Sequence, residues 1–219
     1  MLRALRSTLL ICGSAVLLKV TGETVWGYRG YVPPDFSTDF LIGRQSTFFG
    51  WYAFAFYVHI AASPLALLAG TLLLSDRFRQ RFPRWHRRIG RVHLPVVLVL
   101  VAPSGAAMAL RAAAGPVATA SFVLLAIATI AYGVIGWRKA MRRQFVAHRR
   151  WMIRLHALLC SAVVLRVIGG AGRVAGVTSE WFDPVASWVC WLLPLAVAEW
   201  IVHRARGHAP DRMDGDDRP

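Results

Sequence analysis

Long apolar runs alternate with short, strongly basic segments along most of the chain. An apolar run of about 20 residues is long enough to cross ~30 Å of hydrocarbon as an α-helix. The runs therefore predict an all-α fold, a polytopic membrane bundle with six transmembrane helices. The predicted spans are residues 7–25, 48–74, 92–110, 117–137, 155–172 and 184–202.

The same pattern divides the chain into a first helix, an external segment, a core of five helices and a polar tail. The core contains two basic cytoplasmic loops, residues 75–91 and 138–154. The tail is expected to be disordered and to lie in the cytoplasm. In chain order the four parts are residues 1–25, 26–47, 48–203 and 204–219.

The first span has an alternative interpretation, because its apolar run is short and follows Arg3 and Arg6. Such a run also occurs in cleaved signal peptides, but no small-x-small cleavage site follows it here. We therefore expect a transmembrane helix, with Lys19 extending its charged end out of the apolar region.

The composition favours a membrane protein over a soluble one. Hydrophobic residues make up 56% of the 219 residues and charged residues only 17%, with a mean hydropathy of +0.47. Soluble domains usually have roughly a quarter of their residues charged. The cysteines, Cys12, Cys160 and Cys190, all lie inside apolar runs, so their spacing predicts neither a disulfide framework nor a zinc site.

The net charge of +15 is unevenly distributed along the chain. If both termini and both basic loops lie on one side, 20 of the 26 Lys and Arg residues lie there. Because cytoplasmic segments carry the excess of Lys and Arg, we expect a bacterial inner-membrane protein with both termini in the cytoplasm. The basic loops are then expected to contact anionic lipids, and a nucleic-acid partner is disfavoured.

One motif occurs twice, and each copy leads into an apolar run. It reads His-Arg-Arg, a short spacer, Arg, any residue and His, from His86 to His93 and again from His148 to His156. The two histidines are seven residues apart in the first copy and eight in the second. On a helix with 3.6 residues per turn, both spacings return the second histidine to roughly the same face.

The second histidine of each copy is a candidate ligand. His93 and His156 each follow the last arginine of a basic loop by two residues, so they are expected at matching depth. Two imidazoles on facing helices can ligate a b-type haem, and nearby arginines can pair with its propionates. Two ordinary interfacial histidines are the alternative. His86 and His148 either face lipid headgroups or help to hold a haem, a quinone or a phosphorylated ligand.

Three further ionisable residues lie inside predicted spans, where polar groups are costly and often functional. His59 is 11 residues into the second span, ~16 Å from its outer end, and its alternative role is a neutral ring bonded to a neighbouring helix. Arg166 is expected at a depth near His59, facing the bundle interior, so the two could share a polar cavity. Glu199 is expected near the inner edge, too far from Arg166 to pair with it.

The sequence contains no nucleotide-binding loop, nucleophile elbow, His-Glu-x-x-His or paired Cys-x-x-Cys. This disfavours a hydrolase or an ATP-driven machine, and no catalytic residue is assigned.

Other segments match a known family over about residues 48–202. These segments are Tyr57-Val58-His59-Ile60, His86 to Val92, Ala147 to Arg154, Leu165-Arg166, and Cys190-Trp191 through Ala198-Glu199-Trp200.

In these segments the chain resembles a bacterial family of predicted membrane proteins, the domain of unknown function DUF2306. The resemblance implies a multi-helix integral membrane protein without an assigned activity. The family usually has tyrosine where this chain has His93 and His156, and asparagine where it has Pro194. The resemblance therefore supports another set of positions: His59, His86, His148, Arg166 and Glu199. A more distant similarity links the chain to helical cytochromes b, which hold haem between histidines.

We therefore expect a redox protein that transfers electrons through a haem b or quinone site in the bundle. Haem iron is the only metal expected, and the expected partners are the lipid bilayer, anionic lipids, and a quinone or a membrane redox protein. The first alternative is a small proton or anion transporter that uses His59, Arg166 and Glu199. The second is a lipid-binding or assembly protein without catalysis.

Overall fold

The computed structural model describes residues 2–37 and 39–207, and helices joined by turns and irregular links make up the fold of this part. No strand occurs within these residues, which confirms the all-α prediction. The predicted tail falls largely on residues 208–219, outside the described part. In chain order the elements are α1 (Leu2–Gly27), η1 (Tyr28–Gly30), η2 (Asp39–Leu41), α2 (Gly50–Leu74), α3 (Asp76–Arg81), α4 (Pro83–Pro95), η3 (Val96–Val101), α5 (Ala102–Ala109), α6 (Gly115–Met141), α7 (Phe145–Leu159), α8 (Ser161–Val174) and α9 (Phe182–Gly207).

Five helical stretches in the described residues are long and apolar enough to cross a membrane. They correspond to the five spans predicted for the core: Gly50–Leu74, Pro83–Ala109, Gly115–Met141, Phe145–Val174 and Phe182–Arg204. The first predicted span is a continuous helix, α1, but it is not among the five, so the count of six spans stays a prediction. Within α1, Lys19 is exposed and pairs with Glu23 at 2.6 Å.

The two basic segments are mostly helical, so the prediction of loops at 75–91 and 138–154 was wrong for most of their length. The first segment forms α3 and the beginning of α4, where Pro83 occupies the first turn. In the second, α6 continues to Met141 and α7 begins at Phe145. Arginine is a good helix former, so a high density of charge does not by itself end a helix.

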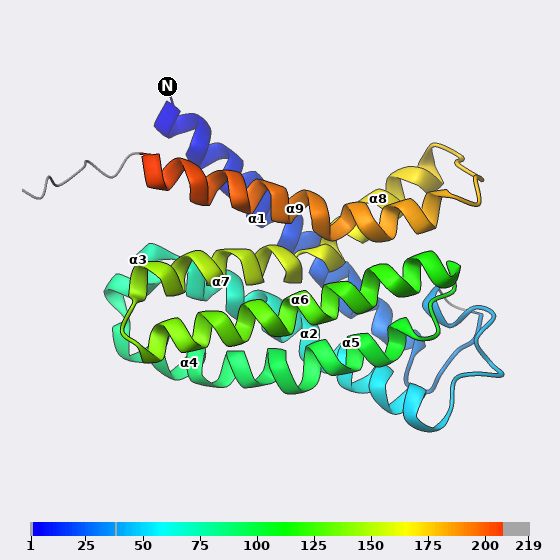
Figure 1. Ribbon diagram of the computed structural model, residues 1–219. Coiled ribbons are helices and arrows are strands. Elements are labelled where there is room, and N and C mark those ends of the chain that lie inside the picture. Colours follow the sequence, from blue (N-terminus) through cyan, green and yellow to red (C-terminus); the bar gives the residue numbers. More distant parts are fainter. Residues whose placement is uncertain (1, 38, 208–219) are drawn as a thin grey trace, which may run out of the picture.

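Four helical rods form the central bundle, and both ends of the described chain lie at the same end as α3 (Figure 1). The rod α4–η3–α5 packs beside α2 and α6, and α7 also packs beside α2 and α6. The rods α4–η3–α5 and α7 therefore face each other diagonally. Outside this bundle α9 crosses α6 and α7, and α8 packs on α9 and α1.

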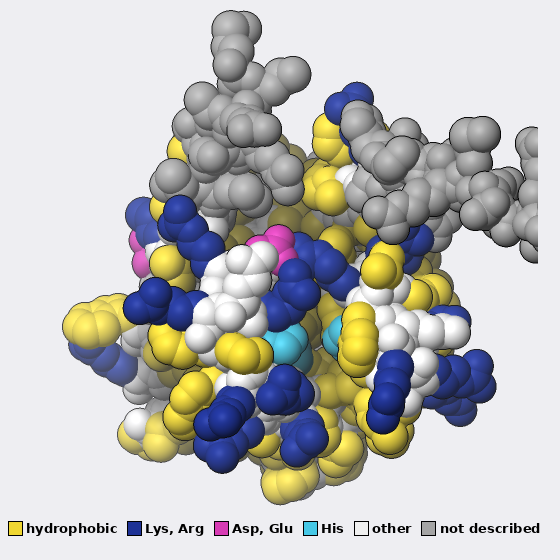
Figure 2. Space-filling view, turned by 90° about the vertical axis from the view of Figure 1, so that its left-hand side faces the viewer, with side chains coloured by type: hydrophobic (Ala, Val, Ile, Leu, Met, Phe, Trp, Pro, Cys, Tyr) yellow, Lys and Arg dark blue, Asp and Glu magenta, His cyan; other side chains and the backbone are white. Residues whose placement is uncertain are grey.

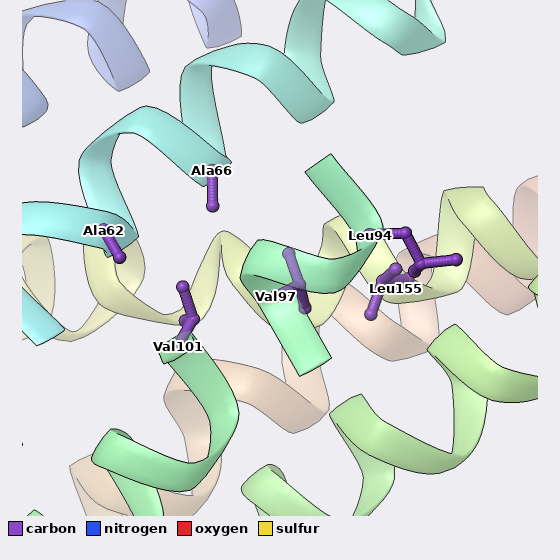
Figure 3. Close-up of a cluster of buried hydrophobic side chains, with 6 residues drawn as sticks. All are labelled: Ala62, Ala66, Leu94, Val97, Val101 and Leu155. Carbon is purple, nitrogen blue, oxygen red and sulfur yellow. The ribbon is translucent and has the colours of Figure 1, made fainter. Parts of the chain in front are cut away.

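The centre of the bundle is filled mainly by small and branched side chains. Figure 3 shows six of them, from α2, α4, η3 and α7: Ala62, Ala66, Leu94, Val97, Val101 and Leu155. Within the rod α4–η3–α5, the six residues of η3 form a π-helical segment that is preceded by Pro95 and followed by Pro103. Such segments are rare in helices and frequently occur at functional sites.

An aromatic cluster joins residues 28–48 to the ends of α2 and α5 that lie opposite α3. Its centre is Phe56, which is 1% exposed and contacts Tyr31, Phe40 and Phe48. Arg44 holds the segment from the other side, because its guanidinium donates to the Tyr52 hydroxyl at 2.9 Å and to a backbone carbonyl at the end of α5. The cluster therefore fixes this end of the bundle.

We predict that Phe56→Ala destabilises the protein by ~3–5 kcal/mol, since it removes a buried ring that the cluster cannot replace. Phe54, on the same helix and 72% exposed, is the matched control, and Phe54→Ala should change stability by less than ~0.5 kcal/mol. Thermal or denaturant unfolding in mild detergent measures both. Equal losses from the two variants would contradict the assigned role of the cluster.

Candidate functional site

The two copies of the repeated motif lie on the diagonal helices, α4 and α7. His86 and His93 are on α4, and His148 and His156 are on α7. Each helix thus carries one histidine near its first turn and a second about two turns deeper. The structure therefore places the predicted histidines in two tiers between the same pair of helices.

The deeper tier, His93 and His156, meets at one glycine of α2. A Cβ atom built on Gly70 would lie 2.8 Å from Nδ1 of His156 and 3.4 Å from Cε1 of His93. His93 is 8% exposed and His156 is partly buried. The two rings are thus close together inside the bundle, at the shared depth that the sequence predicted, and any side chain at position 70 would displace one of them.

Hydrogen bonding assigns the tautomer of His156. The Thr71 hydroxyl has one proton and donates it to the Leu67 carbonyl at 3.0 Å. In its 3.3 Å contact with His156 the hydroxyl must therefore accept, and Nε2 of the ring is the donor. Nδ1 of His156 then carries a lone pair. Neither this atom nor Nδ1 of His93 has a hydrogen-bond partner among the described residues, although both are buried.

The shallower tier, His86 and His148, lies at the end of the bundle that carries the basic segments. Nδ1 of His148 donates to the Gly136 carbonyl at 2.8 Å, which leaves its Nε2 available as an acceptor or ligand. Nδ1 of His86 is buried without a partner in the described structure. Figure 2 shows this end of the molecule, with histidine side chains in the middle of a face rich in Lys and Arg.

Helix α6 also has glycines where it packs in the bundle. It lies diagonally opposite α2, just as α4 lies diagonally opposite α7. A Cβ atom on Gly133 would lie 2.8 Å from Cδ2 of Leu98, and one on Gly136 would overlap the end of the Met152 side chain. Both neighbours are ends of flexible side chains. On α2, Gly70 thus lies directly against the rings of His93 and His156, whereas on α6 Gly133 packs on Leu98 and Gly136 packs on Met152.

His59 lies in the first half of α2, apart from the four histidines of the two tiers. Its Nδ1 is 3.2 Å from the carbonyl oxygen of Val101, in the π-helical segment, and 3.1 Å from the Ser104 hydroxyl. Ser104 already donates to the Leu100 carbonyl. Nδ1 of His59 must therefore be the donor, and its Nε2 carries a lone pair. The ring packs on Gly105, whose Cβ would lie 3.2 Å from Cε1.

The prediction that Arg166 faces the bundle interior was wrong, because its side chain is exposed on α8 and donates to the Ala162 carbonyl of its own helix. A guanidinium on a flexible stem can satisfy its donors at the helix surface. The depth of an arginine along a span therefore does not determine whether its side chain points into the bundle or away from it. Burial raises the pKa of Tyr28, and the nearby charge of Arg166 partly opposes that rise.

The partner of Glu199 is Arg154, a residue that the sequence reasoning counted only as part of a basic loop. The guanidinium binds the carboxylate with both arms, at 2.5 Å from Nε and 2.7 Å from Nη2, and joins α7 to α9. Arg154 is 8% exposed and also packs over the Trp151 ring. The available signal was only its position two residues before His156, at the start of an apolar run. As expected, Glu199 does not pair with Arg166.

A second two-armed ion pair lies at the surface of the same end. Arg149 donates to both oxygens of Asp76 at 2.6 and 2.8 Å, and Arg79 donates to the same carboxylate. Hydrogen bonds from Arg79 and then Arg149 lower the pKa of Asp76. This pair links α3 to α7, but it is exposed to solvent.

We predict that Arg154→Met destabilises the protein by ~1–3 kcal/mol, less than a fully buried pair would lose because part of Glu199 is exposed. The double variant Arg154→Met/Glu199→Met should recover most of this loss, since it leaves no unpaired charge. Arg149→Met breaks the exposed pair and should cost less than ~1 kcal/mol. Unfolding measurements on the three variants test this. A double variant that is as unstable as Arg154→Met would contradict it.

Comparison with known proteins agrees with this architecture. No curated protein and no solved structure matches the chain. A family described as predicted membrane protein, DUF2306, matches residues 56–202, which include both tiers of histidines, His59 and the Arg154–Glu199 pair. The match covers well over half of the chain, and the chain therefore belongs to the DUF2306 family of predicted membrane proteins.

Proposed function

We propose that this membrane protein is an electron-transfer protein that binds a b-type haem between α4 and α7, which His93 and His156 would hold. The observation that carries the proposal is the pair of buried imidazoles on diagonal helices, each with a ring nitrogen that has no partner in the described structure. Buried polar atoms without a partner are rare and point to a missing water, ion or ligand.

The residues around the pair fit such a group. Neutral imidazoles from two helices of a bundle are a common donor set for haem iron. The backbone at Gly70 on α2 and at Gly133 and Gly136 on α6 leaves the two other sides without side chains of their own. On the α6 side the ends of the Leu98 and Met152 side chains fill the space, and both would have to move to admit a haem. Arginines at the inner end of α4 and α7 are suited to pairing with propionates.

Haem iron would supply one-electron chemistry, and the chain's own residues would set its environment. Ligation through the unpartnered Nδ1 of His156 would leave the hydrogen bond from Nε2 to Thr71 in place. The apolar side chains of the bundle core exclude water from the two rings, which favours their neutral, ligating form. The Arg154–Glu199 pair, two residues from His156, holds this part of α7 against α9.

The same geometry gives less support to a transport path along His59, Arg166 and Glu199. Glu199 is engaged by Arg154 at the inner end of the bundle, whereas Arg166 is exposed on α8. The three groups do not form a continuous row, so the redox proposal is preferred.

The proposal predicts a visible spectrum. Protein purified in mild detergent from cells supplied with a haem precursor should show a Soret band that shifts on reduction with dithionite, and a sharp α band. His93→Leu and His156→Leu should each lower bound haem at least tenfold, since a leucine supplies no ligand. His203→Leu, at a site that is exposed on α9, is the matched control and should leave the spectrum unchanged.

In a competing assignment, the shallower tier of histidines, His86 and His148, holds the haem. Loss of the spectrum only in His86→Leu and His148→Leu would transfer the ligands to those residues. A colourless protein that is folded and obtained in full yield would overturn the haem proposal.

A further inference from the structure

An open groove lies between α1 and α2, away from the histidines of the proposed haem site. Its volume is about 390 Å³, which is within the range of small-molecule sites. It is lined by one face of α1 from Leu18 to Trp26, by Arg29 of η1 and by Leu68 of α2. No histidine of either tier belongs to this lining, so the haem proposal does not account for the groove.

The groove exists because α1 contacts the bundle at two separate places. Leu17 packs with Leu67 of α2 and Val163 of α8, and Tyr28, just after α1, joins the aromatic cluster around Phe56. The main partner of α1 among the long helices is α8 rather than α2, which leaves α1 and α2 apart between these places. Leu67 and Val163 belong to helical stretches that can cross a membrane, so the groove lies at the depth of the bilayer.

The length and lining of the groove fit a hydrocarbon chain. Leu18 and Arg29 are eleven residues apart, which corresponds to ~16 Å along a helix. One leaflet of a bilayer contributes half of ~30 Å of hydrocarbon. The side chains of Leu18, Val25 and Leu68 are aliphatic and exposed. The groove therefore matches an acyl chain of one leaflet in both length and polarity.

A charged group lies at one end of the groove. The Arg29 guanidinium lies over the Trp26 ring, 2.8 Å from its centroid, and has no carboxylate partner among the described residues. Tryptophan and arginine are both typical of the membrane–water interface. Because a guanidinium binds phosphate oxygens with paired N–H donors, this end is suited to an anionic head group.

Thr21 adds a second polar group, deeper in the groove. It is the most buried residue of the lining, at 7% exposed, and its hydroxyl has no hydrogen-bond partner in the described structure. It lies five residues, or ~7 Å along the helix, from Trp26, over which the guanidinium is placed. Buried polar atoms without a partner point to a missing water, ion or ligand. The ester carbonyls of a glycerophospholipid, on the chain side of its phosphate, are acceptors of the kind that this hydroxyl lacks.

We propose that the α1–α2 groove binds one anionic phospholipid of the membrane. The phosphate accepts from Arg29, an ester carbonyl accepts from Thr21, and one acyl chain lies along Leu18 and Leu68. Helix α1 begins at the end of the molecule that carries α3 and runs toward the opposite end, so the charged end of the groove lies away from the basic segments (Figure 1). The site is therefore distinct from the lipid contacts expected of those segments, and it does not depend on the haem.

Photo-crosslinking in a bilayer localises the lipid. The protein in phosphatidylcholine nanodiscs receives a small fraction of phosphatidylglycerol with a diazirine on one acyl chain, or of phosphatidylcholine with the same chain. After irradiation, peptide mass spectrometry measures the labelling of residues 18–29 and of Leu68. Phosphatidylglycerol should label these residues about fivefold more than phosphatidylcholine, the ratio expected for one basic residue near an anionic lipid.

Two variants with matched controls separate the groove from its charge. Gly22→Phe fills the groove, since a Cβ at Gly22 meets nothing within 4 Å, and it should remove labelling by both lipids. Gly13→Phe is its control, because Gly13 has equally open surroundings nine residues away, on the opposite face of α1. Arg29→Met should remove the preference for phosphatidylglycerol, whereas Arg173→Met, at an exposed site in the last turn of α8, should keep it.

Several outcomes would overturn the lipid site, whatever the visible spectrum shows. Equal labelling by the two lipids, or a preserved preference in Arg29→Met, would remove the role of the anionic head group. Undiminished labelling in Gly22→Phe would place the lipid outside the groove. A diazirine fatty acid that displaces phosphatidylglycerol from residues 18–29 would assign the groove to a free carboxylate, and a protein dimer that Gly22→Phe disrupts would assign it to a second copy.

Discussion

The structure depends on how imidazole rings are accommodated inside an apolar bundle, where each unpaired polar atom is costly. His59 and His148 meet this constraint by donating Nδ1–H to backbone carbonyls, and His156 meets it by donating Nε2–H to Thr71. In each ring the other nitrogen is left with a lone pair. The bundle thus holds several histidines in defined tautomers and leaves acceptor atoms that the described residues do not satisfy.

Glycines and a π-helical segment make this arrangement possible. Gly70 and Gly105 let imidazole rings reach the backbone of neighbouring helices, and no larger residue fits at either place without displacing a ring. The π-helical segment puts the Val101 carbonyl beside His59. Outside the bundle, the Arg154–Glu199 pair ties α7 to α9 close to His156. Packing, backbone geometry and one partly buried ion pair therefore act on the same histidine side chains.

Much of the fold could be predicted from the sequence, because hydrocarbon thickness sets the length of a span and the charge pattern marks its ends. The depth match of His93 and His156 also followed from helical periodicity. Whether a side chain points into the bundle or out of it could not be predicted in the same way. Arg166 lies at the surface, whereas Arg154 points inward to Glu199. Which helix lies diagonal to which, and which nitrogen of a ring is protonated, depend on tertiary contacts that a single sequence does not display.

Nitrogen-15 magnetic resonance of the histidine rings, recorded before and after haem is added, tests the account most directly. The ligand-free protein should show Nδ1–H tautomers for His59 and His148 and an Nε2–H tautomer for His156. Addition of haem should shift or broaden the signals of His93 and His156 most strongly and leave those of His59 largely in place. Unchanged signals for His93 and His156, or an Nδ1–H tautomer for His156 in the ligand-free protein, would contradict it.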